Sequence, residues 1–121
     1  MPEISITHLL VDLGTVQRLS EVALGHGRFE NQYADLSVDI NLRIFSASAR
    51  EQLVAQERRL NVTHIGYVEP DQDVALLDMI VRTEREGVSI TPEYYHVIGI
   101  LDPSLVHHRK LQLERITKAA L

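Results

Sequence analysis

Cysteine and tryptophan are absent from this sequence, and aromatic residues are scarce, with four tyrosines and two phenylalanines in 121 residues. Without cysteine there is no disulfide, no thiolate nucleophile and no thiolate metal site, which suits folding in a reducing cytosol. No apolar run approaches the roughly 20 residues that a membrane-spanning helix needs. Residues 1–20 also lack the basic start and the apolar stretch of a signal peptide. We therefore expect no membrane contact.

Positive charge is in short supply as well. Lys and Arg number 12 against 17 Asp and Glu, for a formal net charge of −5. A dedicated nucleic-acid clamp needs clustered basic side chains against the phosphates, so this balance argues against one. It still allows DNA to slide past the protein, because a mildly repelling surface does not retain the polymer.

What is present suffices for one domain over residues 1–121. The clearest pattern runs from residue 36 to residue 44, where apolar and polar residues alternate strictly. A period of two predicts a strand with one buried face and one solvated face. The predicted core face consists of Leu36, Val38, Ile40, Leu42 and Ile44.

Other stretches have strand composition, rich in β-branched and aromatic residues and bounded by turn residues. They lie at residues 62–68, 79–83, 94–101 and 111–116. Residues 8–22 predict a strand pair or one bent strand, with Leu9, Val11 and Leu13 on one side.

Residues 48–60 change to a helical period. Ser48 followed by Glu51 has the spacing of a capping box, in which each side chain bonds an amide at the helix start. The stripe along one side of this predicted helix consists of Ala49, Leu53, Gln56 and Leu60.

Residues 25–27 predict a turn that the polar run to Gln32 extends into an open loop, and the polar, glycine-containing segment at residues 84–92 predicts a hairpin loop. Together with the strands and the helix, they predict a mostly β fold. The expected architecture is a small SH3-like open β-barrel or sandwich of five or six strands, with one short helix and long polar loops.

An acidic stretch without any basic residue follows the strand predicted at 62–68. Asp71 and Asp73 have the spacing that begins a calcium loop, but Leu76 and Arg82 replace the glycine and the glutamate that such a loop requires. A solvated loop is therefore expected there rather than a calcium site. The acidic stretch consists of Glu69, Asp71, Asp73 and Asp78.

Histidines do not form a metal-binding pattern. His107 and His108 are adjacent, and adjacent side chains of a strand point to opposite faces, so these two do not share one ion. His64 and His96 lie in separate predicted strands. No nucleophile elbow, phosphate loop or dinucleotide motif is present. We expect no catalytic, cofactor-binding or metal-binding residue and no enzymatic activity.

A more specific signal is the order of several short segments along residues 36–116. They are Leu42 to Glu51; Asn61 to Val68 with Pro70 and Asp73-Val74; Asp78-Met79-Ile80-Val81; Tyr94 to Ile100; Asp102-Pro103-Ser104; and His107 to Leu113. In this order and spacing the segments resemble the head-closure proteins of tailed phages, also called head-completion or head–tail adaptor proteins.

The resemblance implies a structural virion protein that forms a ring, commonly of twelve copies. Such a ring extends the DNA channel, retains packaged DNA and presents a surface to the tail. The implied partners are further copies of the chain, a portal or adaptor ring on the head side, a tail-completion or tail-terminator protein on the tail side, and DNA that passes without sequence specificity. The implied location is the head–tail interface of a virion, after assembly in the host cytoplasm from a phage or prophage genome.

Two segments are candidates for these contacts. The acidic stretch either lines or borders the DNA channel or is an outward, solvated loop. The polar segment after the strand at 79–83 is either a joining loop or a flexible hairpin tip. That segment consists of Glu84, Arg85, Glu86, Gly87, Val88 and Ser89.

Two other functions stay open. A tail-completion or tail-terminator protein would do similar work one ring lower. A cellular β-barrel module for a small ligand or single-stranded nucleic acid would need clustered aromatic or basic side chains on a concave face. The few aromatic residues and the dispersed basic residues of this chain do not favour that last function.

Overall fold

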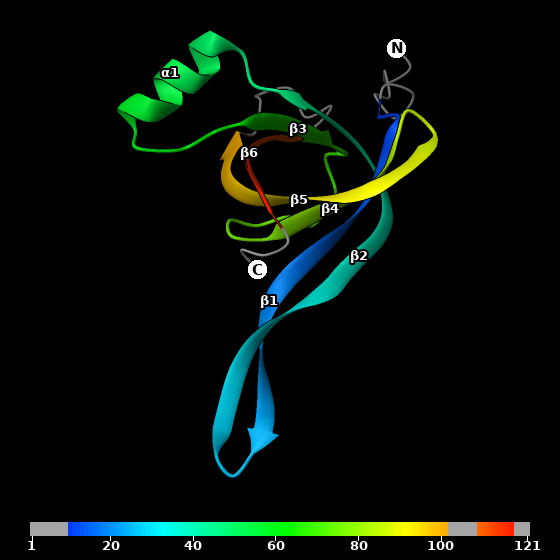
Figure 1. The fold of residues 1–121 in the computed structure, drawn as a ribbon, viewed down its shortest axis with the longest axis vertical. Coiled ribbons are helices and arrows are strands. Elements are labelled where there is room, and N and C mark those ends of the chain that lie inside the picture. The colour runs from blue at the N-terminus through cyan, green and yellow to red at the C-terminus, as the bar shows by residue number, and fades with distance from the viewer. Residues whose placement is uncertain (1–9, 102–108, 118–121) are drawn as a thin grey trace.

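The computed structural model describes residues 10–101 and 109–117 (Figure 1). The predictions for His107, His108 and the turn at Asp102-Pro103 lie outside the described residues. The elements are β1 (Asp12–Gly25), β2 (Arg28–Ser46), α1 (Ala49–Glu57), β3 (His64–Val68), β4 (Met79–Arg85), β5 (Val88–Leu101) and β6 (Arg109–Ile116).

The strands pair in the order β1-β2-β3-β6-β5-β4, and β4 pairs back with β1, so the sheet closes on itself. All neighbours are antiparallel. The predicted fold class, a small mostly β domain with one short helix, is confirmed. The sequence predicted an open barrel or a sandwich, whereas the strand pairing forms a closed barrel. Strands β1 and β2 extend far beyond this closed part (Figure 1).

The core fills the inside of this barrel, because alternate side chains of each strand point inward. Every strand contributes to it. The buried cluster contains Val16, Ile40, Leu42, Ile44, Val68, Val74, Ile80, Tyr95, Val97, Leu111 and Leu113.

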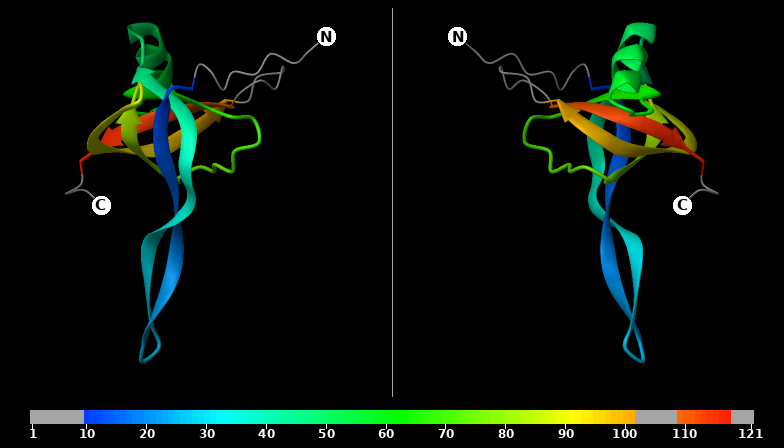
Figure 2. Two further views of the ribbon diagram at one scale, coloured as in Figure 1. Left: turned by 90° about the vertical axis from the view of Figure 1, so that its right-hand side faces the viewer. Right: turned by 90° about the vertical axis from the view of Figure 1, so that its left-hand side faces the viewer.

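The outer parts of β1 and β2, from Arg18 to Gly25 and from Arg28 to Leu36, pair with each other and with no other described strand. We call this two-stranded ribbon the arm; it projects from the barrel and twists along its length (Figures 1 and 2). At its tip, His26 and Gly27 both have positive φ, of 53° and 74°, as a tight two-residue hairpin turn requires. The turn predicted at residues 25–27 is confirmed, but its extension into an open loop is wrong, because residues 28–32 continue the strand.

The predicted core face of β2 is right at the barrel end and wrong toward the arm. Ile40, Leu42 and Ile44 are buried, whereas Leu36 and Val38 are exposed. Two irregularities in the pairing separate these groups, since Gly14 pairs with Ile40 but Val16 pairs with Ser37. An extra residue in one strand turns the following side chains to the other face.

The described part of the apolar side predicted within residues 8–22 faces away from the barrel core. Val11 is exposed, and Leu9 lies outside the described residues. The inward side instead carries Asp12, Gly14 and Val16. The hydrophobic pattern misleads here because a carboxylate takes an inward position, where it meets a buried arginine.

The helix begins as predicted, with the reciprocal capping box of Ser48 and Glu51. Its predicted stripe is wrong, because Ala55 is its buried residue while Leu53 and Val54 are exposed. Ala55 joins a second small core with Ala47, Val62 and Ile65, against which Leu60 packs. The helix therefore rests on the barrel through a small contact, and Figure 1 shows it standing off from the sheet.

The hairpin predicted at 84–92 is present, but its loop is much shorter than predicted. Glu84 and Arg85 end β4, while Val88 and Ser89 begin β5. Glu86 and Gly87 form the turn, again with positive φ at both residues. The longest described connection is instead residues 69–78, which carries the acidic stretch.

Candidate functional site

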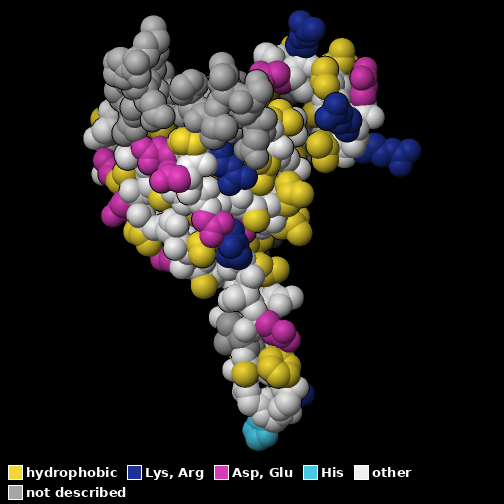
Figure 3. All heavy atoms as spheres, turned by 180° about the vertical axis from the view of Figure 1, so that it is seen from behind, with side chains coloured by type: hydrophobic (Ala, Val, Ile, Leu, Met, Phe, Trp, Pro, Cys, Tyr) yellow, Lys and Arg dark blue, Asp and Glu magenta, His cyan; other side chains and the backbone are white. Residues whose placement is uncertain are grey.

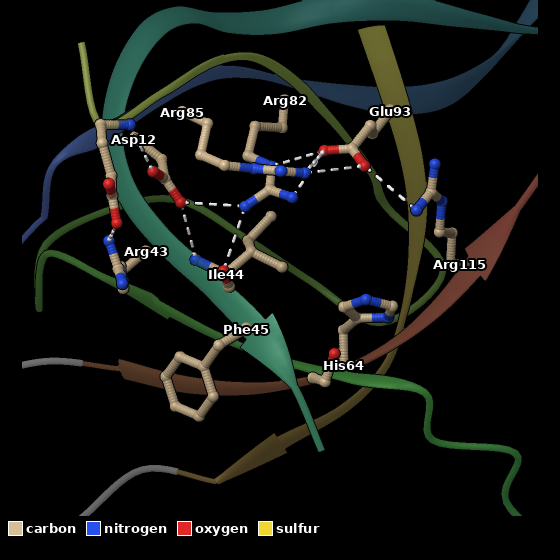
Figure 4. A pocket seen from close by; sticks show the side chains of 11 residues that line it. Asp12, Arg43, Ile44, Phe45, His64, Arg82, Arg85, Glu93 and Arg115 are labelled. Atoms are coloured by element: carbon tan, nitrogen blue, oxygen red, sulfur yellow. Dashed lines mark hydrogen bonds and ion pairs between the residues drawn. The ribbon is translucent and has the colours of Figure 1, made fainter. Parts of the chain in front are cut away.

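A cavity of about 290 Å³ opens at one end of the barrel (Figure 4). Side chains reach it from the start of β1, β3 and β5 and from the end of β2, β4 and β6. Antiparallel pairing brings these strand ends together. Its charged lining residues are Asp12, Arg43, Arg82, Arg85, Glu86, Glu93 and Arg115.

Arg82 is the centre of this cluster, with a side chain that is only 5% exposed. Its Nε donates to Glu93 Oε1 at 2.9 Å, and its Nη1 donates to Asp12 Oδ2 at 3.1 Å and to the Ile44 carbonyl at 3.0 Å. Its Nη2 donates to the Tyr95 hydroxyl at 3.2 Å. Burial opposes the charged form, but the hydrogen bonds to the two carboxylates outweigh burial and raise the pKa of Arg82.

Glu93 is bound by three arginines at once. Besides Arg82, Arg85 Nη2 and Arg115 Nη1 each lie 3.1 Å from a Glu93 carboxylate oxygen. Burial by itself would raise the pKa of Glu93, but the Arg82 hydrogen bond and the nearby positive charges lower it. The carboxylate therefore stays ionised and holds β4, β5 and β6 together.

Asp12 joins the other half of the barrel to the same arginine. Its carboxylate accepts the backbone N–H of Ile44 and that of Glu86, each at 3.1 Å. Glu86 in turn pairs with Arg43 at 3.1 Å. Asp12 thus ties β1 and β2 to the β4–β5 turn, which explains why a carboxylate occupies an inward position of β1.

His64 borders the cavity without entering the ionic cluster. Its Nδ1 lies 2.9 Å from Thr63 Oγ1, and its ring meets Tyr95 edge-on at 5.1 Å. Burial, followed by the charges of Arg115 and Arg82, lowers the pKa of His64. The imidazole is therefore neutral near pH 7.

The cluster has the features of a structural ion-pair network that holds the strands together. Every buried side-chain polar atom in the described part of the chain has a hydrogen-bond partner. A reactive site would keep a donor, an acceptor or a nucleophile available for a substrate. Residues 10–101 and 109–117 contain no group of His, Asp and Glu that would hold a metal ion.

A second ionic cluster anchors the arm to the barrel. Arg18 Nε and Nη2 donate to the two oxygens of Asp78 at 3.0 and 2.9 Å, and Nη2 also donates to Asp73 at 3.0 Å. Hydrogen bonds to Asp78 and then Asp73 raise the pKa of Arg18. Asp78 also accepts the backbone N–H of Ala75 at 2.8 Å, and this hydrogen bond helps to fix the carboxylate that binds Arg18.

The second strand of the arm is fixed at the same level. The Tyr33 hydroxyl donates to the Leu77 carbonyl at 3.4 Å and lies 3.3 Å from His96 Nε2. The Tyr33 and His96 rings lie 6.1 Å apart. Gln17 and Asp35 bond across the two strands at 2.9 Å. The base of the arm is therefore held to the barrel on both strands.

This anchor changes the interpretation of the acidic stretch. Asp78 is buried, with both oxygens bonded to Arg18, so it cannot line a channel. Asp73 is exposed but paired with the same arginine. Asp71 is exposed and Glu69 is half-buried, and a channel-lining role stays a prediction for these two. The sequence could not reveal the pairing, because Arg18 lies 60 residues from Asp78.

The segment predicted to join partners, residues 84–89, borders the cavity. Arg85 and Glu86 line it, whereas Val88 is exposed on the tight hairpin. The segment is not a long loop, but it remains at the surface, and its joining role stays a prediction. No sequence signal indicated the Arg82–Glu93–Asp12 cluster, since its members lie in three separate strands.

No helix within the described ranges has the length and apolar character needed to cross a bilayer. No family model matches the chain, and no curated protein matches it. Among solved structures it is similar to the solution structure of protein SF1141 from Shigella flexneri 2a. The TM-score is 0.72 at 13% sequence identity, over 88% of this chain and 93% of that one. A likeness at this identity shows a shared fold and nothing about activity.

Proposed function

We propose that the chain is a structural virion protein, a head-closure subunit that forms a ring between the portal or adaptor and the tail. The proposal rests on the resemblance of residues 36–116 to such proteins and on one structural observation, the arm. The ring extends the DNA channel and retains the packaged genome.

The arm carries this proposal because its form is hard to explain in an isolated protein. A two-stranded hairpin is at best marginally stable in water. Beyond the anchor at Arg18 and Tyr33, the arm has no third strand among the described residues. A projecting ribbon with apolar side chains in water is typical of a surface that a partner covers. Subunit assembly supplies such a cover.

The cavity also favours a structural role over an enzymatic one. Its arginines and carboxylates pair with one another across four strands, so they hold the barrel closed. A rigid barrel with an anchored arm suits a subunit that must keep its shape while DNA passes under load.

The test is removal of the gene from the phage or prophage that encodes it. We expect DNA-filled heads without tails, which lose DNA on storage, and full recovery when the wild-type chain is supplied. A complementing variant replaces residues 20–32 by an Asn-Gly turn between the paired residues Leu19 and Tyr33, so the anchor at the base of the arm is kept. Its barrel should still unfold in one cooperative transition in urea, yet it should not restore tail attachment. Tailed, infectious particles in the absence of the chain would overturn the proposal.

The same experiment separates the tail-completion or tail-terminator alternative. Loss of such a protein leaves heads that retain DNA and tails that are abnormal in length or in their upper end. Electron microscopy of the two populations distinguishes these outcomes. A cellular binding module would leave particle yield unchanged.

A further inference from the structure

Two elements at opposite ends of the molecule are incompletely covered: the arm and helix α1 (Figures 1 and 2). The helix has nine residues and buries Ala55. A helix this short is marginal without packing. Leu53 is 59% exposed, and its neighbour Val54 is exposed as well. The side of α1 that faces away from the barrel is therefore partly apolar.

The arm presents a matching apolar face. Leu19 pairs with Tyr33 and Ala23 pairs with Phe29, and these pairs are four residues apart along β1. Since side chains alternate across a strand, both pairs lie on the same face of the ribbon, with the polar pair Glu21 and Asn31 between them. Phe29, near the tip, is 63% exposed.

Charge distinguishes the surfaces that could receive this face. Beyond its anchor, the arm carries exposed Glu21, Glu30 and Arg28, for a net charge of −1. Near Leu53 and Val54, basic side chains outnumber acidic ones, and Figure 3 shows dark blue side chains gathered there beside fewer magenta ones. The exposed charged residues of this region are Arg50, Arg58, Arg59 and Glu57, for a net charge of +2.

Among the remaining exposed apolar residues, Leu76 and Leu77 are adjacent and lie at the base of the arm. It lies in the acidic stretch, with exposed Asp71 and Asp73 nearby in the chain. An acidic arm is repelled there and attracted to the helix, because like charges at an interface oppose association.

We propose that the arm of one copy packs its Leu19–Phe29 face on helix α1 of the next copy. This inference deepens the proposed head-closure function by naming the contact that joins neighbouring subunits. The contact is heterologous, because the arm and α1 are different surfaces at opposite ends of the molecule. Repetition of such a contact closes into a ring when the rotation between neighbours permits closure.

The absence of native cysteine makes this contact directly testable. One chain, with an affinity tag, carries Phe29→Cys, and an untagged chain carries Leu53→Cys. The two are mixed under oxidising conditions, both as concentrated purified protein and during complementation of the deleted phage. A disulfide forms when the two Cα atoms lie within about 7 Å, so an incidental encounter does not give efficient coupling.

We expect a tagged–untagged disulfide dimer on a non-reducing gel. A chain that carries both substitutions should give a ladder of oligomers. The matched control pairs Phe29→Cys with Leu77→Cys, which is more exposed than Leu53 but lies in the acidic stretch. Coupling to Leu77→Cys in place of Leu53→Cys, or coupling to neither in both preparations, overturns the inference.

Charge reversal gives an independent readout. Glu21→Arg with Glu30→Arg should lower the disulfide yield by about threefold, the size expected for exposed ion pairs. Arg50→Glu with Arg58→Glu in the partner chain should restore it. The two proposals can fail separately. If particles need the chain but no disulfide forms, the head-closure function is supported and the arm–helix contact is excluded. If the disulfide forms in purified protein but virions are normal in the absence of the chain, the contact is supported and the head-closure function is excluded.

Discussion

At the scale of single residues, the barrel depends on buried charged side chains, which the hydrophobic pattern of the sequence would assign to solvent-exposed positions. Arg82, Glu93 and Asp12 occupy inward positions on three strands and satisfy one another. Removing an ion from water costs several kcal/mol, and its partners offset this cost only when the geometry is complete. The cluster is therefore sensitive to the loss of any one member.

Glu93→Gln tests this sensitivity. The amide keeps the size of the side chain but leaves Arg82, Arg85 and Arg115 without a shared carboxylate. We expect the free energy of unfolding to fall by about 3–5 kcal/mol, the usual cost of breaking a buried pair. Urea denaturation measures it. Glu57→Gln, on the exposed face of α1, is the control and should stay within about 0.5 kcal/mol of wild type.

The same variant should change the acid limb of the stability curve. Because folding lowers the pKa of Glu93, its contribution is present above the unfolded value of about 4.3 and is lost as the pH falls through the folded pKa. The wild type should therefore lose stability steeply below about pH 4.3, and Glu93→Gln less steeply. Parallel curves for the two proteins would show that folding does not lower the pKa of Glu93.

At the scale of elements, the sequence predicted correctly those features that depend only on residues close together in the chain. The capping box located the start of α1, and alternation located the barrel part of β2. The turn at residues 25–27 and the hairpin within residues 84–92 were predicted, but both were expected to be longer, because polar residues that continue a ribbon into solvent resemble a loop. The bulge in β2 was missed for another reason: its position follows from pairing with β1, which alternation within one strand does not encode.

The bulge gives a matched pair of substitutions within one strand. Ile40 lies in the core and Val38 lies outside it, although both belong to the same alternating pattern. Ile40→Ala should lower the free energy of unfolding by about 2–5 kcal/mol, through lost burial and the remaining cavity. Val38→Ala should change it by less than about 0.5 kcal/mol in the free chain. Equal effects of the two in thermal or urea unfolding would contradict the observed register.

The anchor of the arm is a second feature that joins distant segments. Arg18→Ala leaves the buried carboxylate of Asp78 without its cation. We expect faster hydrogen exchange in the amides of residues 20–33, because the base of the arm is released. Arg28→Ala, at the exposed end of the same arm, should leave exchange at the base unchanged. If exchange in the arm is equal in both variants, Arg18 does not hold it.

At the scale of the whole molecule, the fold separates a closed barrel from two outlying elements. The barrel is held by its core and by the Arg82 cluster, whereas the arm and α1 depend on small contacts at their bases. This division suits assembly, since a stable body presents marginal elements that become ordered against a neighbour. The sequence resemblance suggested a ring but not its contacts, because neither the arm nor the exposed side of α1 has a distinctive motif.

The channel hypothesis now depends on the exposed Asp71 and the half-buried Glu69, because Asp78 is buried and Asp73 is paired with Arg18. In a ring, one exposed acid per subunit repeats around a single opening, and its field reaches about a Debye length, ~8 Å at physiological salt. Asp71→Lys should slow DNA ejection from intact particles and make its rate more dependent on salt, because the lysines attract the passing phosphates. Asp71→Asn, at the same position, removes the charge without reversing it and should have a smaller effect. Unchanged ejection with poor tail attachment in the lysine variant would assign this loop to the joint between proteins and exclude it from the channel.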